Sequence, residues 1–289
     1  TIRGHCRTFQ QSIDDNYGGK GLAVYASKAF NCKEMCRIIK DEGLGIDVVS
    51  GGELYTALSV DFPPEKIVFH GNNKTEEEIK LALESGVGRI VVDNLTELRT
   101  IEKMAAELNK NPGVMIRIKP GIDAHTHNFI RTGQIDSKFG FALETGKAFE
   151  AIKEVLEQKN VTLKGVHCHI GSQIFEIDPF KAAAEVMLGF MAKVKKELSY
   201  EIKELNLGGG FGKTIHDMAY EQQNIVKIDF ATRGLFLLVG AVDVGEPSGV
   251  ESGGRLPMGD GTCPGIIFHR HQRDFGPIDF GEHIANGQR

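Results

Sequence analysis

The strongest constraint on the fold is an alternation of short apolar runs with longer amphipathic stretches between Leu22 and Leu207. The short runs are rich in Val and Ile, which favour strands, whereas the longer stretches have a helical period. Strands are predicted at residues 22–26, 46–49, 67–70, 90–93, 114–118, 163–169 and 205–207, with an eighth candidate at 235–242. Helices are predicted at residues 33–41, 53–59, 76–84, 95–108, 147–158 and 179–198.

Apolar strands that are each followed by a helix predict a parallel sheet buried on both faces. Seven such units and an eighth candidate favour an α/β fold with a closed (β/α)8 TIM-like barrel, and an open Rossmann sheet is the alternative. Thr75 and Thr96 are predicted helix N-caps, and Glu78 has the spacing of a capping-box partner of Thr75. The barrel is assigned to residues 1–242, and residues 243–289 form a tail without this alternation.

Composition narrows the classes of partner. A net charge of −5 and a pI of about 6.1 argue against a nucleic-acid binder, for which a basic face is typical, so the expected partner is a small molecule. No apolar run reaches the roughly 18 residues of a membrane span. The first five residues lack the apolar core of a signal peptide, so a cytoplasmic protein is expected. The five scattered cysteines contain no Cys-x-x-Cys pair, which predicts reduced thiols.

Functional groups of such barrels gather at the carboxyl-terminal ends of the strands. Lys28 follows the first strand, where burial in the barrel mouth would free its amine for Schiff-base chemistry, although most lysines are solvated surface groups. His167 and His169 end the sixth strand on the same face. They are either core histidines or include a ring that stacks on a planar cofactor, with Ser172 hydrogen-bonded to a phosphate.

Three glycines, Gly208, Gly209 and Gly210, follow the seventh strand, and their backbone N–H groups can approach an anion such as phosphate. A flexible surface loop is less favoured because the glycines directly follow an apolar strand. Asp47 and Glu53 flank the end of the second strand, and Arg117 ends the fifth. These charged groups could orient a cofactor ring or a catalytic histidine, although each alone is more often an ordinary ion pair.

Six segments, in order and in spacing, resemble the diaminopimelate decarboxylases, which are barrel enzymes of the alanine-racemase-like fold type that depend on pyridoxal 5'-phosphate (PLP). They are Tyr25–Ala29, Asp47–Leu54, Phe69–Lys74, Asp123–Gly140, His167–Gln173 and Gly208–Gly212. The resemblance covers about residues 2–212 and is closer than that to ornithine or arginine decarboxylases.

The resemblance implies that Lys28 carries PLP and that His169 stacks on the pyridine ring, and these two are the predicted catalytic residues. It also implies that Ser172 and Gly210 bind the phosphate, with Gly209 beside them at the cofactor. Asp47, Glu53 and Arg117 match the family's supporting residues around the lysine, the histidine and the ring, and Lys138 matches a lysine near the subunit interface.

The activity implied is decarboxylation of meso-2,6-diaminopimelate to L-lysine, the last step of lysine biosynthesis, by a homodimer. In the family, a C-terminal β domain of the partner subunit supplies a cysteine acid from a Cys-Glu-Ser-Gly-Asp motif. Here the nearest echoes, Val250–Gly254 and Glu246–Gly249, lack that cysteine and the arginine of a second family motif, so this domain is incomplete or unrecognisable in the tail.

Three alternatives remain. One is a non-catalytic or impaired barrel that binds PLP without turnover, and another is a decarboxylase for a different basic amino acid. The third is a metal-dependent barrel hydrolase, suggested by the His-x-His pairs at residues 125/127, 167/169 and 269/271.

Overall fold

A computed structural model describes residues 2–122, 139–172, 174–211 and the backbone of 236–240. These residues lie in one compact unit that spans Thr1–Glu246. Among them, no helix is long and apolar enough to cross a membrane.

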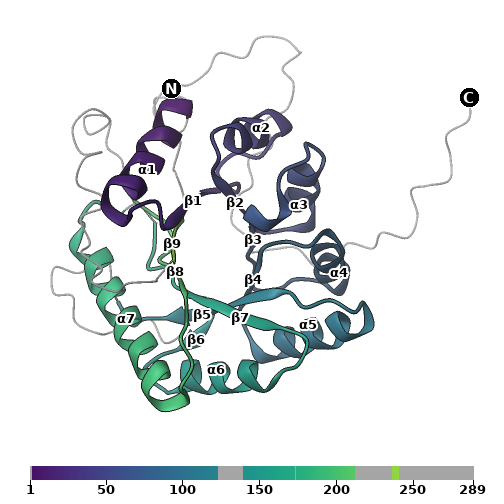
Figure 1. Cartoon of the computed structure of the whole chain (residues 1–289), viewed down its shortest axis with the longest axis vertical. Coiled ribbons are helices and arrows are strands. Elements are labelled where there is room, and N and C mark those ends of the chain that lie inside the picture. Colours follow the sequence, from purple (N-terminus) through teal and green to yellow (C-terminus); the bar gives the residue numbers. More distant parts are fainter. Residues whose placement is uncertain (1, 123–138, 173, 212–235, 241–289) are drawn as a thin grey trace, which may run out of the picture. The chain divides into compact units, whose positions relative to one another are not determined.

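Eight parallel strands close into a barrel (Figure 1). In order around the ring they are β1 (Gly21–Ala26), β2 (Gly45–Val48), β3 (Ile67–Phe69), β4 (Arg89–Val92), β5 (Gly113–Lys119), β7 (Thr162–His167), β8 (Glu204–Asn206) and β9 (Phe236–Gly240). The β1–β9 and β4–β5 pairings close the ring, which confirms the predicted (β/α)8 barrel and excludes the open Rossmann sheet. A short strand, β6 (Phe141–Ala142), pairs with the end of β5.

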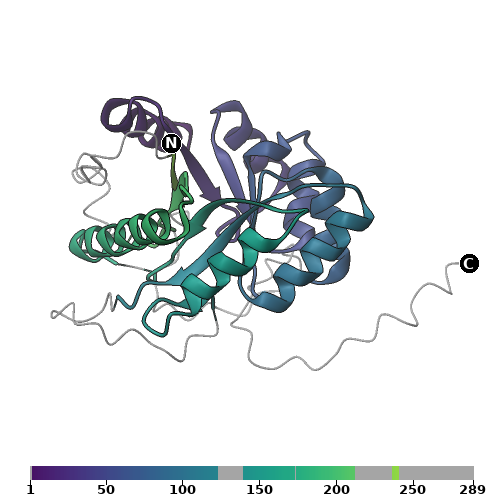
Figure 2. The same ribbon diagram turned by 60° about the horizontal axis from the view of Figure 1, so that its bottom comes forward.

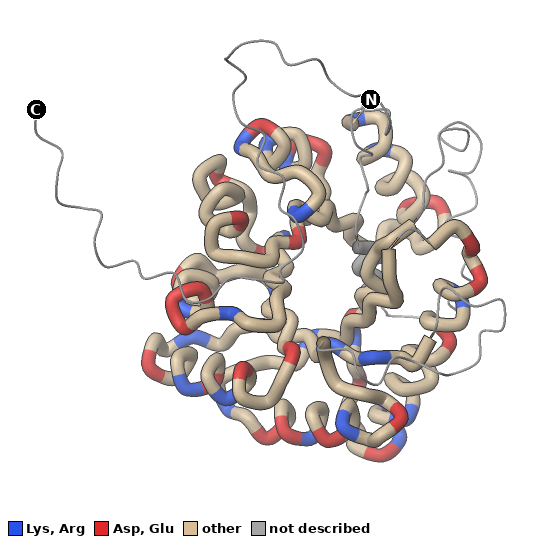
Figure 3. Tube along the Cα trace, turned by 180° about the vertical axis from the view of Figure 1, so that it is seen from behind, with Lys and Arg blue, Asp and Glu red and all other residues tan. Residues whose placement is uncertain are grey.

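Helices surround this ring on the outside, as two views show (Figures 1 and 2). They are α1 (Ile2–Tyr17), α2 (Lys33–Asp41), α3 (Gly51–Leu58), α4 (Glu76–Ser85), α5 (Leu95–Glu107), α6 (Lys147–Glu157) and α7 (Asp178–Leu198), with a 3-10 turn η1 (Pro64–Lys66) before β3. Charged residues concentrate on the helices, whereas the strands are mostly uncharged (Figure 3).

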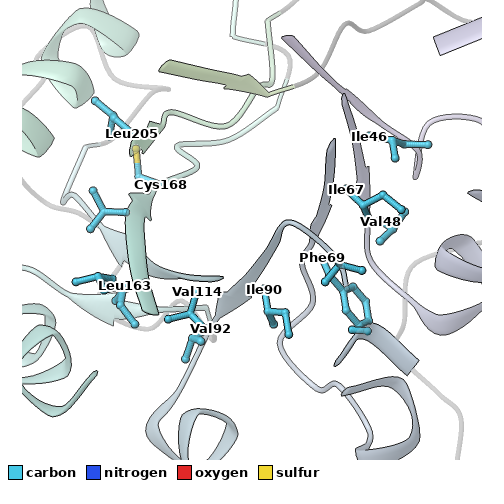
Figure 4. Close-up of a cluster of buried hydrophobic side chains, with 14 of the residues drawn as sticks. Ile46, Val48, Ile67, Phe69, Ile90, Val92, Val114, Leu163, Cys168 and Leu205 are labelled. Carbon is cyan, nitrogen blue, oxygen red and sulfur yellow. The ribbon is translucent and has the colours of Figure 1, made fainter. Parts of the chain in front are cut away.

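The strands whose side chains are described pack in two directions, because successive side chains alternate between the two faces. One set packs outward against the helices and includes Ile46, Phe69 and Ile90 (Figure 4). The other set fills the barrel and is centred on four buried side chains, which are Val24, Val68, Val91 and Met115. The barrel is therefore a packed core rather than a pore.

One of the two predicted helix N-caps is observed in the structure, and the other is not. Thr75 caps α4, and Glu78 completes the predicted capping box. The prediction of Thr96 as a cap is wrong, because the side chain of Asn94, in extended backbone, accepts a hydrogen bond from the N–H of Glu97 and begins α5 two residues earlier. The side-chain oxygen of an Asn that precedes the first turn accepts a hydrogen bond from a backbone N–H that has no partner within the helix.

Helix α1 was not predicted. Its buried Cys6 and Ile13 face the barrel, and the helix contacts β1. Arg3 and Arg7 both bind Glu42 at the end of α2, with Nη1–Oε1 and Nε–Oε2 distances of 2.9 and 2.7 Å. These contacts attach α1 to the barrel as an additional outer helix.

The amino-terminal end of the barrel contains an ion pair between the first residues of two strands. Arg89 of β4 donates through Nε and Nη2 to the carboxylate of Glu204 in β8, at 2.9 and 2.8 Å. Strands β5 and β7 lie between β4 and β8 in the ring, so this pair links strands that are not neighbours.

Candidate active site

Polar side chains replace apolar ones at the carboxyl-terminal ends of six strands. They are Asp47, His70, Asp93, Arg117, His167 and Asn206. Four of the six are buried. Because burying a polar group is unfavourable unless it is bonded, such a ring in an otherwise apolar barrel marks a functional site.

Two histidines meet across the barrel at this end. His70 Nε2 lies 3.2 Å from Asp47 Oδ1. Its ring also packs edge-on against His167, with the ring centroids 4.6 Å apart at an angle of 72°. The contact joins β3 and β7, which β4 and β5 separate in the ring.

A second cluster forms around Asp93. Arg117 Nη1 lies 3.5 Å from one carboxylate oxygen of Asp93, and the N–H of Gly140 donates to the other at 2.9 Å. The guanidinium of Arg117 lies 4.3 Å from the centre of the Phe139 ring. The predicted Arg117 thus has a fixed position at the site, although its ion-pair partner was not predicted.

Lys28 lies just past β1, as predicted, but its side chain is exposed rather than buried. The reason is that the chain turns immediately after Ala26, so Lys28 lies beyond the packed end of the strand. The preceding Ser27 is buried and donates through its hydroxyl to Glu53 Oε2 at 2.6 Å. The same oxygen accepts the N–H of Val49 at 2.8 Å, so Glu53 braces the ends of β1 and β2 beside Lys28.

His169 is close enough to Lys28 for the two to interact electrostatically. Burial, and then the positive charges of Lys28 and Arg117, lower the pKa of His169 to about 4. Burial also holds the pKa of His167 well below its usual value of 6.5, with His70 acting in the same direction. Both imidazoles are therefore neutral at pH 7.

The glycine segment after β8 packs against the segment that carries His169 and Ser172. Gly208 has a φ of +73°, and a Cβ there would lie 2.9 Å from His169 Nδ1. Gly210 has a φ of +106°, and a Cβ there would overlap the carbonyl oxygen of Gly171. Only glycine allows these two segments to approach so closely. Gly209, which is buried, and Ser172, which is exposed, therefore lie at the same end of the barrel.

A second lysine near the site, Lys74, is buried, whereas Lys28 is exposed. Its side chain is 1% exposed, and Nζ donates to Glu97 Oε1 at 2.6 Å and to the carbonyls of Val91 and Gly71 at 2.7 and 2.8 Å. All three ammonium protons are therefore used. Lys74 supports the loop after β3, whereas Lys28 is the amine presented at the mouth.

The structure brings all of the predicted site residues to one end of the barrel. They are Lys28, Asp47, Glu53, Arg117, His169, Ser172, Gly209 and Gly210. Sequence reasoning missed the roles of His70, Asp93, Asn206 and Lys74. His70 and Lys74 belong to the segment Phe69–Lys74, which resembles the family, and Asp93 directly follows an apolar strand. The positions of these three residues could therefore have predicted a role at the site.

Several other predicted features lie outside the described residues. They are Lys138, the His-x-His pairs at 125/127 and 269/271, both motif echoes, and the tail at 243–289. Within the described part of the chain, no group of three or more His, Cys, Asp or Glu side chains could hold a metal ion. The described cysteines form no disulfide bonds; they are Cys6, Cys32, Cys36 and Cys168.

Residues 1–232 match the family model described as pyridoxal-dependent decarboxylase, pyridoxal binding domain. The chain belongs to this family. Among curated pyridoxal-dependent decarboxylases, it is 50% identical to the diaminopimelate decarboxylase of Bacillus methanolicus over 211 residues, which is 73% of this chain and 49% of that protein. It is 48% identical to the Bacillus subtilis (strain 168) enzyme over 73% of this chain and 48% of that protein.

Solved structures of family members agree with the fold. The diaminopimelate decarboxylase from M. jannaschii superposes with a TM-score of 0.73 at 34% identity, over 81% of this chain and 57% of that one. The Helicobacter pylori enzyme, complexed with L-lysine, gives 0.67 at 29% identity over 82% of this chain and 61% of that one. The predicted resemblance is thus confirmed, and the chain spans about half the length of the curated relatives it matches.

Proposed function

We propose that this chain is the PLP-binding barrel of a carboxy-lyase that converts meso-2,6-diaminopimelate to L-lysine. The observation that carries the proposal is the meeting of Lys28, His169 and the glycine segment at one barrel mouth. The relatives that match over the barrel are named diaminopimelate decarboxylase, and solved relatives hold L-lysine. We also propose that residues 1–242 form the PLP-binding domain of a cytoplasmic homodimer.

The residues at the mouth fit the chemical groups of PLP. The exposed amine of Lys28 suits its aldehyde, and a neutral ring of His169 suits its planar pyridine. Gly208 and Gly210 form a cradle that any Cβ would obstruct, and Ser172 adds a hydroxyl beside it, so both suit a phosphate. Phosphate sites after the last strands are frequent in (β/α)8 barrels.

Each of these residues has a separate task in the proposed reaction. Lys28 would hold the cofactor through its amine. Glu53 fixes the turn that carries Lys28 through its hydrogen bonds to Ser27 and the N–H of Val49. His169 would cover one face of the cofactor ring without adding charge, because burial and the charges of Lys28 and Arg117 lower its pKa to about 4.

Decarboxylation itself draws on the cofactor. When bound, PLP supplies a conjugated ring that accepts the electron pair left by the departing carboxylate. The chain's own contribution is to orient the scissile bond and exclude water, which favours loss of the carboxylate over competing reactions. In the family, the acid that returns a proton to the substrate is a cysteine of the partner subunit, and the matching motif is not found at Val250–Gly254 of this chain.

The assignment of Lys28 is tested by PLP titration followed by borohydride reduction and peptide mass spectrometry. We expect one PLP per chain, fixed to Lys28, and loss of both the label and the visible absorbance in Lys28→Ala. Lys33→Ala is the matched control, since it removes a nearby exposed lysine at the start of α2. Full binding by Lys28→Ala, with the label on another lysine, would contradict the assignment.

Turnover separates the proposed enzyme from a barrel that only binds PLP. The binding-only alternative has specific support, because Val250–Gly254 and Glu246–Gly249 lack the cysteine and the arginine of the corresponding family motifs. Carbon dioxide release should be measured with meso-diaminopimelate, L-lysine, L-ornithine and L-arginine. Release from meso-diaminopimelate alone supports the proposal, release from another amino acid reassigns the substrate, and PLP binding without release supports the non-catalytic reading.

A further inference from the structure

The backbone of His70 is held by hydrogen bonds on both sides. Its N–H donates to the carbonyl of Val48 at 2.8 Å. The next carbonyl, that of Gly71, accepts from the buried ammonium of Lys74 at 2.8 Å, and Lys74 is itself paired with Glu97. The imidazole of His70 thus leaves a fixed point at the end of β3.

The side chain of His70 is also held in one orientation. An ionised Asp47 can only accept a hydrogen bond, so His70 Nε2, at 3.2 Å from Oδ1, carries the proton. The side chains of Asp47 and His70 are 13% and 10% exposed, which limits competition from water. The ring can therefore transmit its position to whatever packs against it.

The group that packs against it is His167 on the opposite side of the barrel. The rings meet edge to face with centroids 4.6 Å apart, an arrangement that aromatic rings prefer. Nδ1 of His167 is buried and has no hydrogen-bond partner among the described residues. The ring of His70 and a side-chain hydrogen bond with Asn206 therefore hold this side chain together.

His167 begins the segment proposed to contact PLP. Cys168 N–H donates to the carbonyl of Asn206 at 2.9 Å, and Ile174 N–H donates to the carbonyl of Gly210 at 2.9 Å. The segment that begins at His167 is thus joined to the end of β8 through Cys168 and to the glycine segment through Ile174. A displacement at His167 would move His169 and the glycines together.

We propose that His70 is a positioning residue: bonded to Asp47 and packed on His167, it fixes the His169 segment and the glycine segment relative to Lys28. This inference rests on the proposed function, since PLP is the probe of the geometry. It assigns no contact between His70 and the cofactor.

The test compares three variants in the full 289-residue chain. His70→Ala removes both contacts, His70→Phe keeps an aromatic ring but loses the bond to Asp47, and His70→Asn keeps a donor but loses the ring. We expect the dissociation constant of PLP to rise about tenfold in His70→Ala and about threefold in each of the others. The visible circular dichroism of bound PLP at saturation should also fall, because the cofactor is held less uniformly.

A double-mutant cycle tests the route through His167. If His70 acts through that ring, His70→Ala should add little to the loss caused by His167→Ala, whereas fully additive losses would overturn the route. Tyr200→Phe is the matched control. It removes a hydrogen bond to the carbonyl of Leu163 near the other end of β7, and it should leave both PLP readouts unchanged.

The remaining outcomes distinguish the two proposals. Wild-type affinity and dichroism in a folded His70→Ala chain would overturn the positioning role while leaving PLP binding at Lys28 intact. If His70→Ala fails to fold, unchanged binding by His70→Phe and His70→Asn would overturn it instead. A wild-type chain that does not bind PLP would overturn the proposed function and this inference with it.

Discussion

Two histidines separated by one residue have different surroundings at this barrel mouth. His167 is 4% exposed at the end of β7, whereas His169 lies beyond the strand and is only partly buried. Burial lowers the pKa of both, and the charges of Lys28 and Arg117 add to the effect at His169. The site therefore keeps two neutral imidazoles beside cationic groups.

The free energy of unfolding in mild acid should depend on the lowered pKa of His167. In the unfolded chain its pKa returns to about 6.5, so below that pH the unfolded state binds a proton that the folded state does not. The stabilisation is fully present above pH 6.5 and is lost as the pH falls towards the depressed folded pKa. Each such group contributes at most about 1.4 kcal/mol per pH unit to the slope.

The measurement is urea unfolding of the wild-type chain and His167→Gln at several pH values without added PLP. Between about pH 6 and about pH 5 we expect the free energy of unfolding to fall less steeply in His167→Gln. Above neutrality the two curves should run parallel, which controls for the general cost of the substitution. Equal slopes below pH 6 would show that His167 already takes up a proton in the folded state.

At the residue scale, the sequence predicted positions better than contacts. Lys28, His169 and Ser172 were identified because each follows a strand or belongs to a family segment. The contact of His70 with His167 was not predictable in this way. It joins strands that are distant around the ring, so it depends on closure of the barrel and on its register rather than on local pattern.

At the scale of elements, α1 shows how charge attaches a helix to a barrel. Arg3 and Arg7 converge on the single carboxylate of Glu42, and hydrogen bonds first from Arg7 and then from Arg3 lower the pKa of Glu42 to about 2. This stabilisation is present above the ordinary pKa of the carboxyl and is lost as the pH falls towards about 2.

Replacing Glu42 should loosen α1 more than the rest of the molecule. In Glu42→Gln we expect faster amide hydrogen exchange throughout α1, with little change in the barrel strands, because the two arginines lose their shared anion. Asp41→Asn is the matched control, since Asp41 is half exposed and meets only Arg3 in these ion pairs. Equal exchange in the two variants would mean that apolar packing alone holds the helix.

Element boundaries were largely predictable, and the exception is instructive. Helix α2 was predicted at its observed bounds of Lys33–Asp41, and the strands agree within about two residues. Helix α1 was missed although Cys6, Phe9, Ile13 and Tyr17 recur at helical spacing. Its many polar residues hid a narrow apolar stripe, so the period was a better guide than overall hydrophobicity.

At the scale of the whole molecule, an ion pair links two non-neighbouring strands at the amino-terminal end of the barrel. Arg89 and Glu204 join β4 and β8 through two hydrogen bonds, and both side chains are 13% exposed. A charge left without its partner in such a place is strongly unfavourable, whereas an apolar pair of similar volume can replace an ion pair at little cost.

We expect Arg89→Met to lower the free energy of unfolding by about 3 kcal/mol, and Arg89→Met combined with Glu204→Leu to recover most of that loss. Chemical denaturation of the three proteins provides the measurement. Arg99→Met, which breaks the more exposed pair with Glu154 between two outer helices, should cost no more than about 1 kcal/mol. A double variant less stable than Arg89→Met would argue that charge itself is required inside the barrel.

The pairing of β1 with β9 has a consequence for how the chain matures. During translation, Lys28 emerges well before Gly208 and Gly210, yet these residues lie at the same end of the barrel. Because β9 supplies the final pairings of the ring, a nascent barrel has unpaired edges until that strand leaves the ribosome. Cofactor capture should therefore follow the emergence of β9 rather than that of Lys28.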